Sequence, residues 1–329
     1  MADVARLAGV APQTVSRVSN GQPGVVETTR VKVLAAMEEL QYRPNHAARA
    51  LKRGSFQSFA VVLSGRASAG SFQTLQAIIE AAAGRGYSVT VMALEVPDVG
   101  SLNKIFMRMG EAAIDGAILV MELESAAGVH LSRLPYGRLV VVDANAGTQY
   151  PAVDSDQASG VDAAMAHLLG LGHGTVHHVT GHANSFSSNH RVDLWRAHLE
   201  RAGRPVPVTV AGDWTAASGY RAGVQITEEG VATAVFLCND EMALGLMRAF
   251  GERGVRVPQD VSVVGFDDIA LASQFPVPLT TIRQDFDEVG RRAVDMLIRQ
   301  LEGDTIVPHV DWVPTRLIVR QSSAAPPVR

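Results

Sequence analysis

The chain has 329 residues, of which 47% are hydrophobic and 19% are charged, a composition typical of a globular protein with two or three domains. Its longest apolar runs, such as Ala117 to Met121, fall far short of the roughly 20 residues that cross a bilayer, which excludes a membrane-spanning protein. The single cysteine, Cys238, excludes an internal disulfide. Asp3 and Arg6 interrupt the apolar segment that a signal peptide needs, so we expect a cytoplasmic protein.

Charge is distributed unevenly along the chain. The net charge of −4 argues by itself against a protein that binds nucleic acid. Residues 1–55, however, contain eight lysines and arginines and four acids, which gives +4 and leaves −8 for residues 56–329. A small basic segment on an acidic body is the pattern expected when DNA binding is confined to one end of the chain.

The segment from Asp3 to Asn20 predicts two short helices around a tight turn. Gly9 supplies the residue that a sharp turn needs, and Pro12 opens the second helix, where its missing N–H costs nothing. The apolar face of the first helix consists of Val4, Ala5, Leu7 and Ala8. The second helix turns its apolar side, Val15 and Val18, toward the first and leaves polar side chains outward: Gln13, Thr14, Ser16, Arg17 and Asn20.

That outward polar set suits the major groove of DNA. Glutamine and arginine read base edges bidentately, whereas threonine, serine and asparagine bind phosphate oxygens. The alternative is an ordinary helical hairpin with a solvated polar face, because short motifs produce false positives. The basic charge of the same segment favours DNA binding.

A third helix is predicted from Thr28 or Thr29 to Leu40, and Pro44 ends it because proline disfavours helix at the preceding residue. We expect its apolar side to close a small head spanning residues 1–44. That side consists of Val31, Val33, Leu34, Met37 and Leu40.

Residues 45–55 form a basic connection between the head and the body, and about eight of these residues favour helix. A helix of that length is shorter than the roughly 12–15 residues that an isolated helix needs to be stable in water. Two interpretations remain open. The segment is either a flexible basic linker, which this stretch alone favours, or a hinge helix that forms only on DNA. In the second case Leu51 would wedge between base steps in the minor groove.

From residue 56 to 329, apolar runs alternate with helical segments, the pattern of a doubly wound parallel sheet. The first half predicts strands at 59–63, 87–92, 116–121 and 138–143 and helices at 72–85 and 101–113. The alternation restarts beyond Asp154, with helices at 158–171, 189–202, 217–229, 241–253 and 285–301 and strands at 175–180, 232–237, 261–266, 279–282 and 315–320. We therefore expect two similar α/β lobes with a cleft between them.

Polar residues follow several of the predicted strands. In open sheets of this kind, ligands bind beyond the carboxyl ends of the strands. Those ends carry Ser64, Asp143, Asn239, Asp240, Asp267 and Asp268. Side chains of this kind suit a small molecule rich in hydroxyl groups.

The head sequence DVARLAGVAPQTVSRVSN and the later motifs CNDEMALG (238–245) and VPQDVSVVGFDDIALA (257–272) resemble the lactose/galactose-repressor family of bacterial transcription regulators. The resemblance covers essentially the whole chain. It implies a helix-turn-helix head on a two-lobed body like that of periplasmic binding proteins. It also implies a repressor that binds a pseudo-palindromic double-stranded operator as a homodimer and is controlled by a small-molecule effector, a sugar, without a cofactor or a metal.

The resemblance also assigns site residues. DNA would be bound by Pro12, Gln13, Thr14, Ser16, Arg17, Asn20, Asn45, Ala48 and Leu51. The effector would be bound by Ser71, Asp143, Ser187, Arg191, Trp214, Asn239, Asp267, Gln284 and Phe286.

The chain departs from the family pattern in three places. The polar residue that members place before the first helix is missing, because only two residues precede Asp3. Ala11 stands where the family commonly has a serine N-cap, a loss of about 1 kcal/mol of helix stability. Asp193 and Leu194 stand where a glycine usually follows the arginine, which affects the pocket near Arg191.

The sequence disfavours three alternative functions. A periplasmic sugar-binding protein would share the two-lobed body but would need an export signal and no DNA-binding head. An enzyme is disfavoured because no GxSxG, P-loop or GxGxxG motif is found. A metal site built from His173, His177, His178, His182 and His190 is disfavoured because adjacent residues of a strand point to opposite faces.

The end of the chain bears on the oligomeric state. The tail from Gln321 onward contains no leucine heptad and so cannot build a helical tetramerisation bundle. The sequence therefore predicts a dimer.

Overall fold

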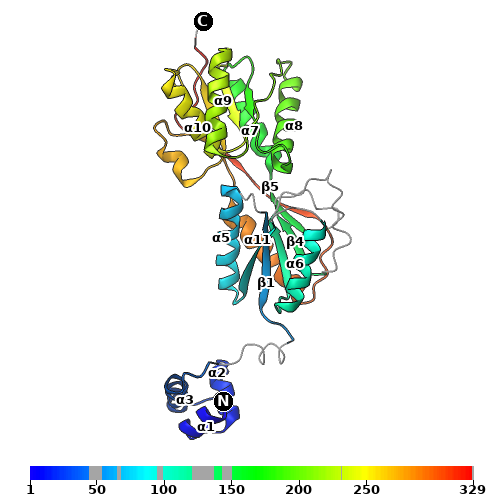
Figure 1. The fold of residues 1–329 in the computed structure, drawn as a ribbon, viewed down its shortest axis with the longest axis vertical. Helices are drawn as coiled ribbons and strands as arrows, with labels where there is room; N and C mark the ends of the chain where they lie inside the picture. Colours follow the sequence, from blue (N-terminus) through cyan, green and yellow to red (C-terminus); the bar gives the residue numbers. More distant parts are fainter. Residues whose placement is uncertain are drawn as a thin grey trace. The chain divides into compact units, whose positions relative to one another are not determined.

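The computed structural model describes residues 1–43, 54–64, 68–94, 99–120, 137–142, 150–230 and 232–327. The chain divides into two compact units, Met1–Phe56 and Gln57–Arg329, and each is described by itself (Figure 1). Four residues with predicted roles lie outside the described ranges: Asn45, Ala48, Leu51 and Asp143. In the described part of the chain, no helix combines the length and the apolar character that crossing a membrane requires.

The described part of the first unit contains the helices α1 (Ala2–Ala8), α2 (Pro12–Ser19) and α3 (Glu27–Glu39). Gly9 ends α1 with a left-handed backbone (φ 65°), a conformation that glycine adopts without steric cost. Pro12 stands at the first position of α2, as the sequence predicted, and the N-cap Ala11 makes no side-chain capping bond. Val15 and Val18 of α2 are buried against the other two helices.

The core of the head is smaller than the sequence predicted. It consists of Val4, Ala5, Val15, Val18, Val33 and Ala36. Four residues predicted to be in this core are 43–57% exposed, so that prediction was wrong for them: Leu7, Val31, Leu34 and Leu40. The reason is that α1 and α2 cover only one narrow side of α3. Val33 and Ala36, three residues apart, share that side, whereas Val31 and Leu34 lie further round the helix.

The second unit begins with a Rossmann-like run of strands and helices that forms most of the first lobe. Its elements are β1 (Ser58–Ser64), α5 (Ala69–Gly84), β2 (Ser88–Leu94), α6 (Val99–Glu111), β3 (Gly116–Val120), β4 (Leu139–Val142) and β5 (Ala152–Ser155). The sheet has the order β10-β5-β4-β3-β1-β2, and the paired strands are parallel. The inner strands are buried on both faces and therefore read as continuous apolar runs.

The second lobe repeats this architecture. It contains α7 (Gln157–Gly170), β6 (His177–Val179), α8 (Phe186–Arg201), α9 (Ala216–Glu229), β7 (Ala234–Leu237), α10 (Asp240–Glu252), β8 (Ser262–Asp267), a 3₁₀ turn (Ala270–Gln274), β9 (Thr280–Arg283) and β11 (Arg316–Ile318). The sheet order is β11-β9-β8-β7-β6, with β11 antiparallel to β9 and the other neighbours parallel. The predicted pair of α/β lobes is confirmed.

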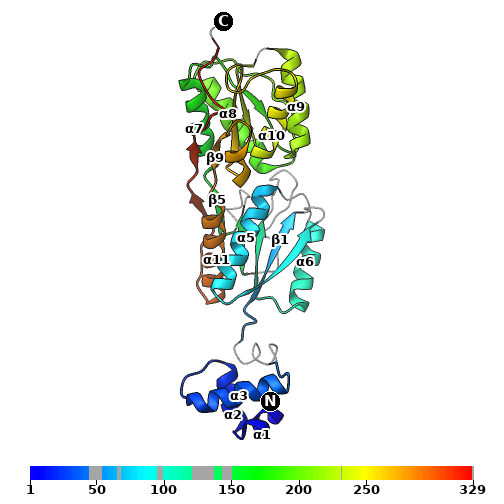
Figure 2. The same cartoon turned by 90° about the vertical axis from the view of Figure 1, so that its left-hand side faces the viewer.

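Helix α11 (Phe286–Leu301) and strand β10 (Val310–Val313) lie in the first lobe, although they follow the second in sequence. Val289 and Leu297 of α11 share a buried cluster with Phe59 and Val61 of β1. Both views show α11 beside α5 (Figures 1 and 2). The sequence placed this helix in the second half, because a periodic apolar face does not reveal which sheet it will cover.

The chain passes between the lobes at β5–α7, β9–α11 and β10–β11. Two of these crossings are tied together by hydrogen bonds. The amide of Asp156 donates to the carbonyl oxygen of Val313 at 2.8 Å, and the hydroxyl of Thr315 donates to the carbonyl oxygen of Asp156 at 2.8 Å. The β5–α7 and β10–β11 crossings are therefore bonded to each other rather than independent linkers.

Candidate functional site

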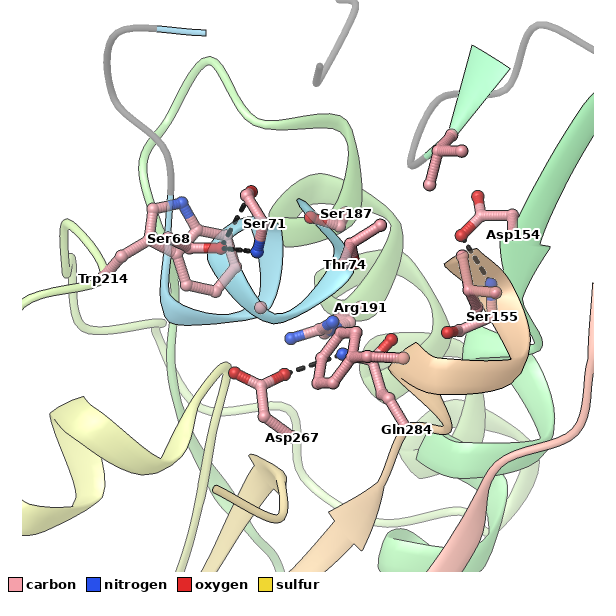
Figure 3. Close-up of a pocket in the computed structure, with 14 residues that line it drawn as sticks. Ser68, Ser71, Thr74, Asp154, Ser155, Ser187, Arg191, Trp214, Asp267 and Gln284 are labelled. Carbon is pink, nitrogen blue, oxygen red and sulfur yellow. Dashed lines mark hydrogen bonds between the residues drawn. The ribbon is translucent and has the colours of Figure 1, made fainter. Parts of the chain in front are cut away.

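A cavity lies between the two lobes, at the carboxyl ends of their parallel strands (Figure 3). Its volume is about 30 Å³, room for roughly two water molecules. The lining residues are Ser68, Gly70, Ser71, Thr74, Val142, Asp154, Ser155, Ser187, Arg191, Trp214, Asp267, Gln284, Phe286 and Val289.

The structure brings together most of the effector residues that the resemblance assigned. Those that line the cavity are Ser71, Ser187, Arg191, Trp214, Asp267, Gln284 and Phe286. Asp143 lies outside the described residues, and Asn239 does not line the cavity. The sequence did not single out Asp154 and Ser155 as ligand residues. Their position at the carboxyl end of β5 is the signal that could have found them.

Arg191 is the central cation of the cavity and is only 3% exposed. Its Nε donates to the side-chain oxygen of Gln157 at 2.7 Å, and its Nη1 donates to the carbonyl oxygen of Cys238. The guanidinium carbon lies 3.6 Å from the ring centre of Phe266, a cation–π contact. Because these partners are neutral, they orient the guanidinium without cancelling its charge.

A chain of amides connects Arg191 to Asp267 across the crossings between the lobes. The amide nitrogen of Gln157 donates to the side-chain oxygen of Gln284 at 3.4 Å, and Gln284 donates to the Oδ1 atom of Asp267 at 2.7 Å. Gln157 begins α7 just after the first crossing, and Gln284 lies in the second. The cavity-lining groups Arg191 and Asp267 are thus hydrogen-bonded to segments that cross between the lobes.

Trp214 and Asp267 both have left-handed backbones, with φ values of 71° and 110°. Non-glycine residues rarely adopt such conformations, which cost of order 1–3 kcal/mol each and concentrate at functional sites. The indole of Trp214 packs directly on Gly181, where an added Cβ would lie 2.4 Å from the ring. Gly181 therefore makes room for the aromatic wall of the cavity.

The structure places Asn239 differently from the prediction. Its Oδ1 accepts from the amide of Met242 at 2.9 Å, which caps α10, and its Nδ2 donates to the carbonyl oxygen of Trp214 at 3.0 Å. The residue is 1% exposed, and both of its polar groups are used in these bonds. Asn239 supports Trp214 from behind instead of facing the cavity.

Two further buried groups lie directly behind this wall. His178 stacks between Trp195 and Phe236, and burial lowers its pKa to about 3. Its Nδ1 donates to the carbonyl oxygen of Phe236 at 2.9 Å, so its Nε2 accepts from the thiol of Cys238 at 3.4 Å. Burial raises the pKa of Cys238 to about 11. Both groups are neutral at physiological pH, and among the described residues no set of three or more His, Cys, Asp or Glu is placed to hold a metal.

The head presents a separate candidate surface on α2. Pro12, Gln13 and Arg17 are exposed, whereas Thr14 and Ser16 are partly buried. Asn20, at the end of the helix, donates from its amide to the carbonyl oxygen of Ser16 at 2.7 Å. Gln13 and Arg17, the residues of the types that read base edges, are therefore exposed on α2.

Comparisons with known proteins agree with this geometry. Residues 1–45 match the family described as bacterial regulatory proteins, lacI family, and residues 165–323 match a periplasmic binding protein-like domain. The chain is 33% identical to the lactose operon repressor of Escherichia coli, over 98% of this chain and 90% of that protein.

The chain belongs to the lacI family of bacterial regulatory proteins. It is also 32% identical to the ribose operon repressor of Escherichia coli, over 93% of this chain and 94% of that protein. Among solved structures, it resembles that of the lac repressor dimer bound to operator and the anti-inducer ONPF, with a TM-score of 0.89 and 34% identity over 98% of both chains.

Membership of the lacI family confirms the predicted class of function. The chain is a DNA-binding transcriptional repressor controlled by a small-molecule effector, and its relatives are repressors rather than enzymes. The predicted fold class, a helix-turn-helix head with a two-lobed periplasmic-binding-protein-like body, is confirmed as well.

Proposed function

We propose that the protein is a cytoplasmic repressor that binds a pseudo-palindromic operator as a homodimer, and that its effector is a neutral sugar held in the interlobe cavity. The observation that carries the choice of a neutral sugar is the charge of the described lining. It contains two carboxylates, Asp154 and Asp267, and one guanidinium, Arg191. This balance disfavours an anionic ligand such as a sugar phosphate.

The lining also matches the two kinds of surface that a sugar presents. Carboxylate and amide oxygens accept hydrogen bonds from hydroxyl groups, and the Arg191 guanidinium donates to them. Trp214 offers a ring against which the apolar face of a pyranose or furanose can stack. Two of the relatives are named for the lactose and ribose operons, which is consistent with a sugar.

The proposal divides the chain by role. Residues 1–44 bind DNA, with Pro12, Gln13 and Arg17 reading bases and Thr14, Ser16 and Asn20 binding phosphates. Residues 45–55 connect head and body and contact the operator centre through Asn45, Ala48 and Leu51, which lie outside the described residues, and residues 56–329 bind the effector and dimerise. Effector binding changes the angle between the lobes and thereby the spacing of the two heads. Such coupling is typically about 1–3 kcal/mol.

The first test is thermal unfolding of the purified protein against neutral sugars, sugar phosphates and nucleosides. A ligand at about 100 times its dissociation constant stabilises the native state by roughly 2.7 kcal/mol, a rise of about 5–10 °C for a unit of this size. We expect one or more neutral sugars to give such a shift. Operator binding repeated with that sugar then shows whether it induces or represses. A shift with sugar phosphates alone would refute the choice of a neutral ligand.

The second test is the substitution Arg17→Ala in α2. Arg17 is exposed on the proposed reading face, and loss of a base-reading arginine costs about 1–3 kcal/mol. We therefore expect operator affinity to fall roughly 5- to 150-fold while binding to unrelated DNA changes much less. Arg6→Ala is the matched control, because Arg6 is equally cationic and lies on α1, 80% exposed beside Asp3. Equal losses for the two variants would show that α2 does not read sequence.

A further inference from the structure

Asp268 follows the cavity residue Asp267 but is turned away into the protein. Its side chain is only 2% exposed and is bound by two arginines. The Nε of Arg283 donates to Oδ2, and the Nη2 of Arg320 donates to Oδ1 at 2.6 Å. Both carboxylate oxygens are thus occupied by charged donors, and Asp268 joins the end of β8 to β9 and to the segment after β11.

The backbone at this point is strained and is held from its other side as well. Asp267 and Asp268 have φ values of 110° and 56°, two consecutive non-glycine residues in left-handed conformations. Asp240, at the start of α10, accepts from the amide of Ile269 at 2.9 Å and from the hydroxyl of Thr281 at 2.6 Å. Burial raises the pKa of Asp240 well above its usual range, and the neighbouring Asp267 carboxylate raises it further.

Arg283 also connects the turn at Asp267 and Asp268 to the crossing between β9 and α11. Asp267 and Arg283 are partners in the register of β8 and β9, and Arg283 directly precedes Gln284. Gln284 in turn donates to the Asp267 carboxylate at 2.7 Å. The position of the Asp267 side chain therefore depends on a turn that Asp268 fixes to the strand leading into the second crossing.

Stability alone explains this cluster poorly. Replacing a buried ion-paired group by apolar residues of similar volume is often neutral or stabilising, because the desolvation of the charges offsets their attraction. Position 268 also has a backbone conformation that glycine adopts at far lower cost. A carboxylate bound by two arginines is better explained as a device that holds the adjacent residue in one orientation.

We infer that Asp268, clamped by Arg283 and Arg320, is a positioning residue that keeps the Asp267 carboxylate directed into the effector cavity. The inference rests on the proposed function, in which Asp267 accepts hydrogen bonds from the effector. It assigns Asp268 no contact with the ligand itself. The pair of adjacent aspartates then has divided roles, one facing the ligand and the other fixing the turn.

The test is the crystal structure of Asp268→Asn, which keeps the shape of the side chain and removes its charge. We expect the distance from Asp267 Oδ1 to Gln284 Nε2 to grow from 2.7 Å to beyond about 3.5 Å, outside hydrogen-bonding range. Arg320→Lys retains a charged donor and should keep the bond. Arg283→Met should lengthen the Asp267–Gln284 distance in the same way as Asp268→Asn. It is less apt to prevent folding, because the Arg283 side chain is 41% exposed.

Asp260→Asn is the matched control, because Asp260 also accepts two charged bonds from one arginine, Arg256, in the same lobe. It should leave the Asp267–Gln284 bond intact. If Asp267 keeps its position in Asp268→Asn and in Arg283→Met, whatever the loss of stability, Asp268 is merely structural and the inference is wrong. The readout needs no ligand, so a sugar panel without a hit would overturn the proposed effector and leave this result interpretable.

Discussion

Replacing Arg191 by methionine is expected to weaken effector binding at least about 100-fold. Hydrogen bonds to charged groups contribute roughly 1.5–3 kcal/mol each, and a guanidinium aimed at ligand oxygens makes more than one. Methionine keeps much of the volume of the stem and removes the donors. The change should also destabilise the fold by about 1–3 kcal/mol, because Gln157 and the carbonyl oxygen of Cys238 lose their buried donor.

Arg196→Met is the control variant, because it removes a different arginine from the same helix, α8. Arg196 lies on the same helix, 49% exposed, and its nearest acid, Asp193, is 3.8 Å away. Such surface pairs contribute little, so stability should change by less than about 0.5 kcal/mol and binding not at all. The measurement is calorimetric titration with the sugar that gives the largest thermal shift, together with urea unfolding. Undiminished binding by Arg191→Met would place the effector elsewhere.

Local patterns in the sequence were enough to predict the elements that carry several of the site residues. Pro12 and the polar run after it define α2 by helix chemistry alone, and Arg17 lies on its exposed side. Asp267 and Gln284 were assigned from short and contiguous family motifs, and both line the cavity. In each case the residues that decide the outcome are neighbours in sequence.

The sequence was a poor guide where contacts between segments far apart in the chain determine the position of a helix or a side chain. Nothing in the apolar face of α11 indicates that it leaves the second lobe and covers the sheet of the first. Asn239 ends a strand as a ligand residue would, but its Oδ1 caps α10 and its Nδ2 donates to the carbonyl oxygen of Trp214. Residue type and position after the strand do not distinguish Asp267 from Asp268, although the family resemblance assigned Asp267 to the effector. Only the positions of Arg283 and Arg320 show which carboxylate is turned inward.

The contact between α9 and α10 also depends on packing between distant segments. Disrupting it is the change that we expect to lower the free energy of unfolding most. Gly219 and Gly245 allow the two backbones to meet. A Cβ added at Gly245 would lie 1.8 Å from the carbonyl oxygen of Ala216, and one at Gly219 would lie 2.0 Å from that of Met242. Because the opposing atoms are backbone, no side chain can rotate away to relieve the clash.

Gly245→Ala should therefore destabilise the protein by about 3 kcal/mol or more, at the upper end of what overpacking costs. This corresponds to a fall in Tm of roughly 6–12 °C. Gly251→Ala, on the same helix with no atom within 4 Å of the added Cβ, should be neutral or more stable by up to about 1 kcal/mol, since alanine favours helix. Urea unfolding of the two variants measures the difference.

The same variant tests how the packing of the second lobe supports the cavity. If α10 moves away from α9, Asn239 at its N-terminus moves with it, and the bond that holds the Trp214 carbonyl oxygen lengthens from 3.0 Å. Gly245→Ala should then weaken sugar binding in the folded protein, whereas Gly251→Ala should not. Equal stability of the two variants would mean that the backbones of α9 and α10 lie farther apart than these distances require. Reduced stability with unchanged sugar affinity would show that Trp214 is held independently of α10.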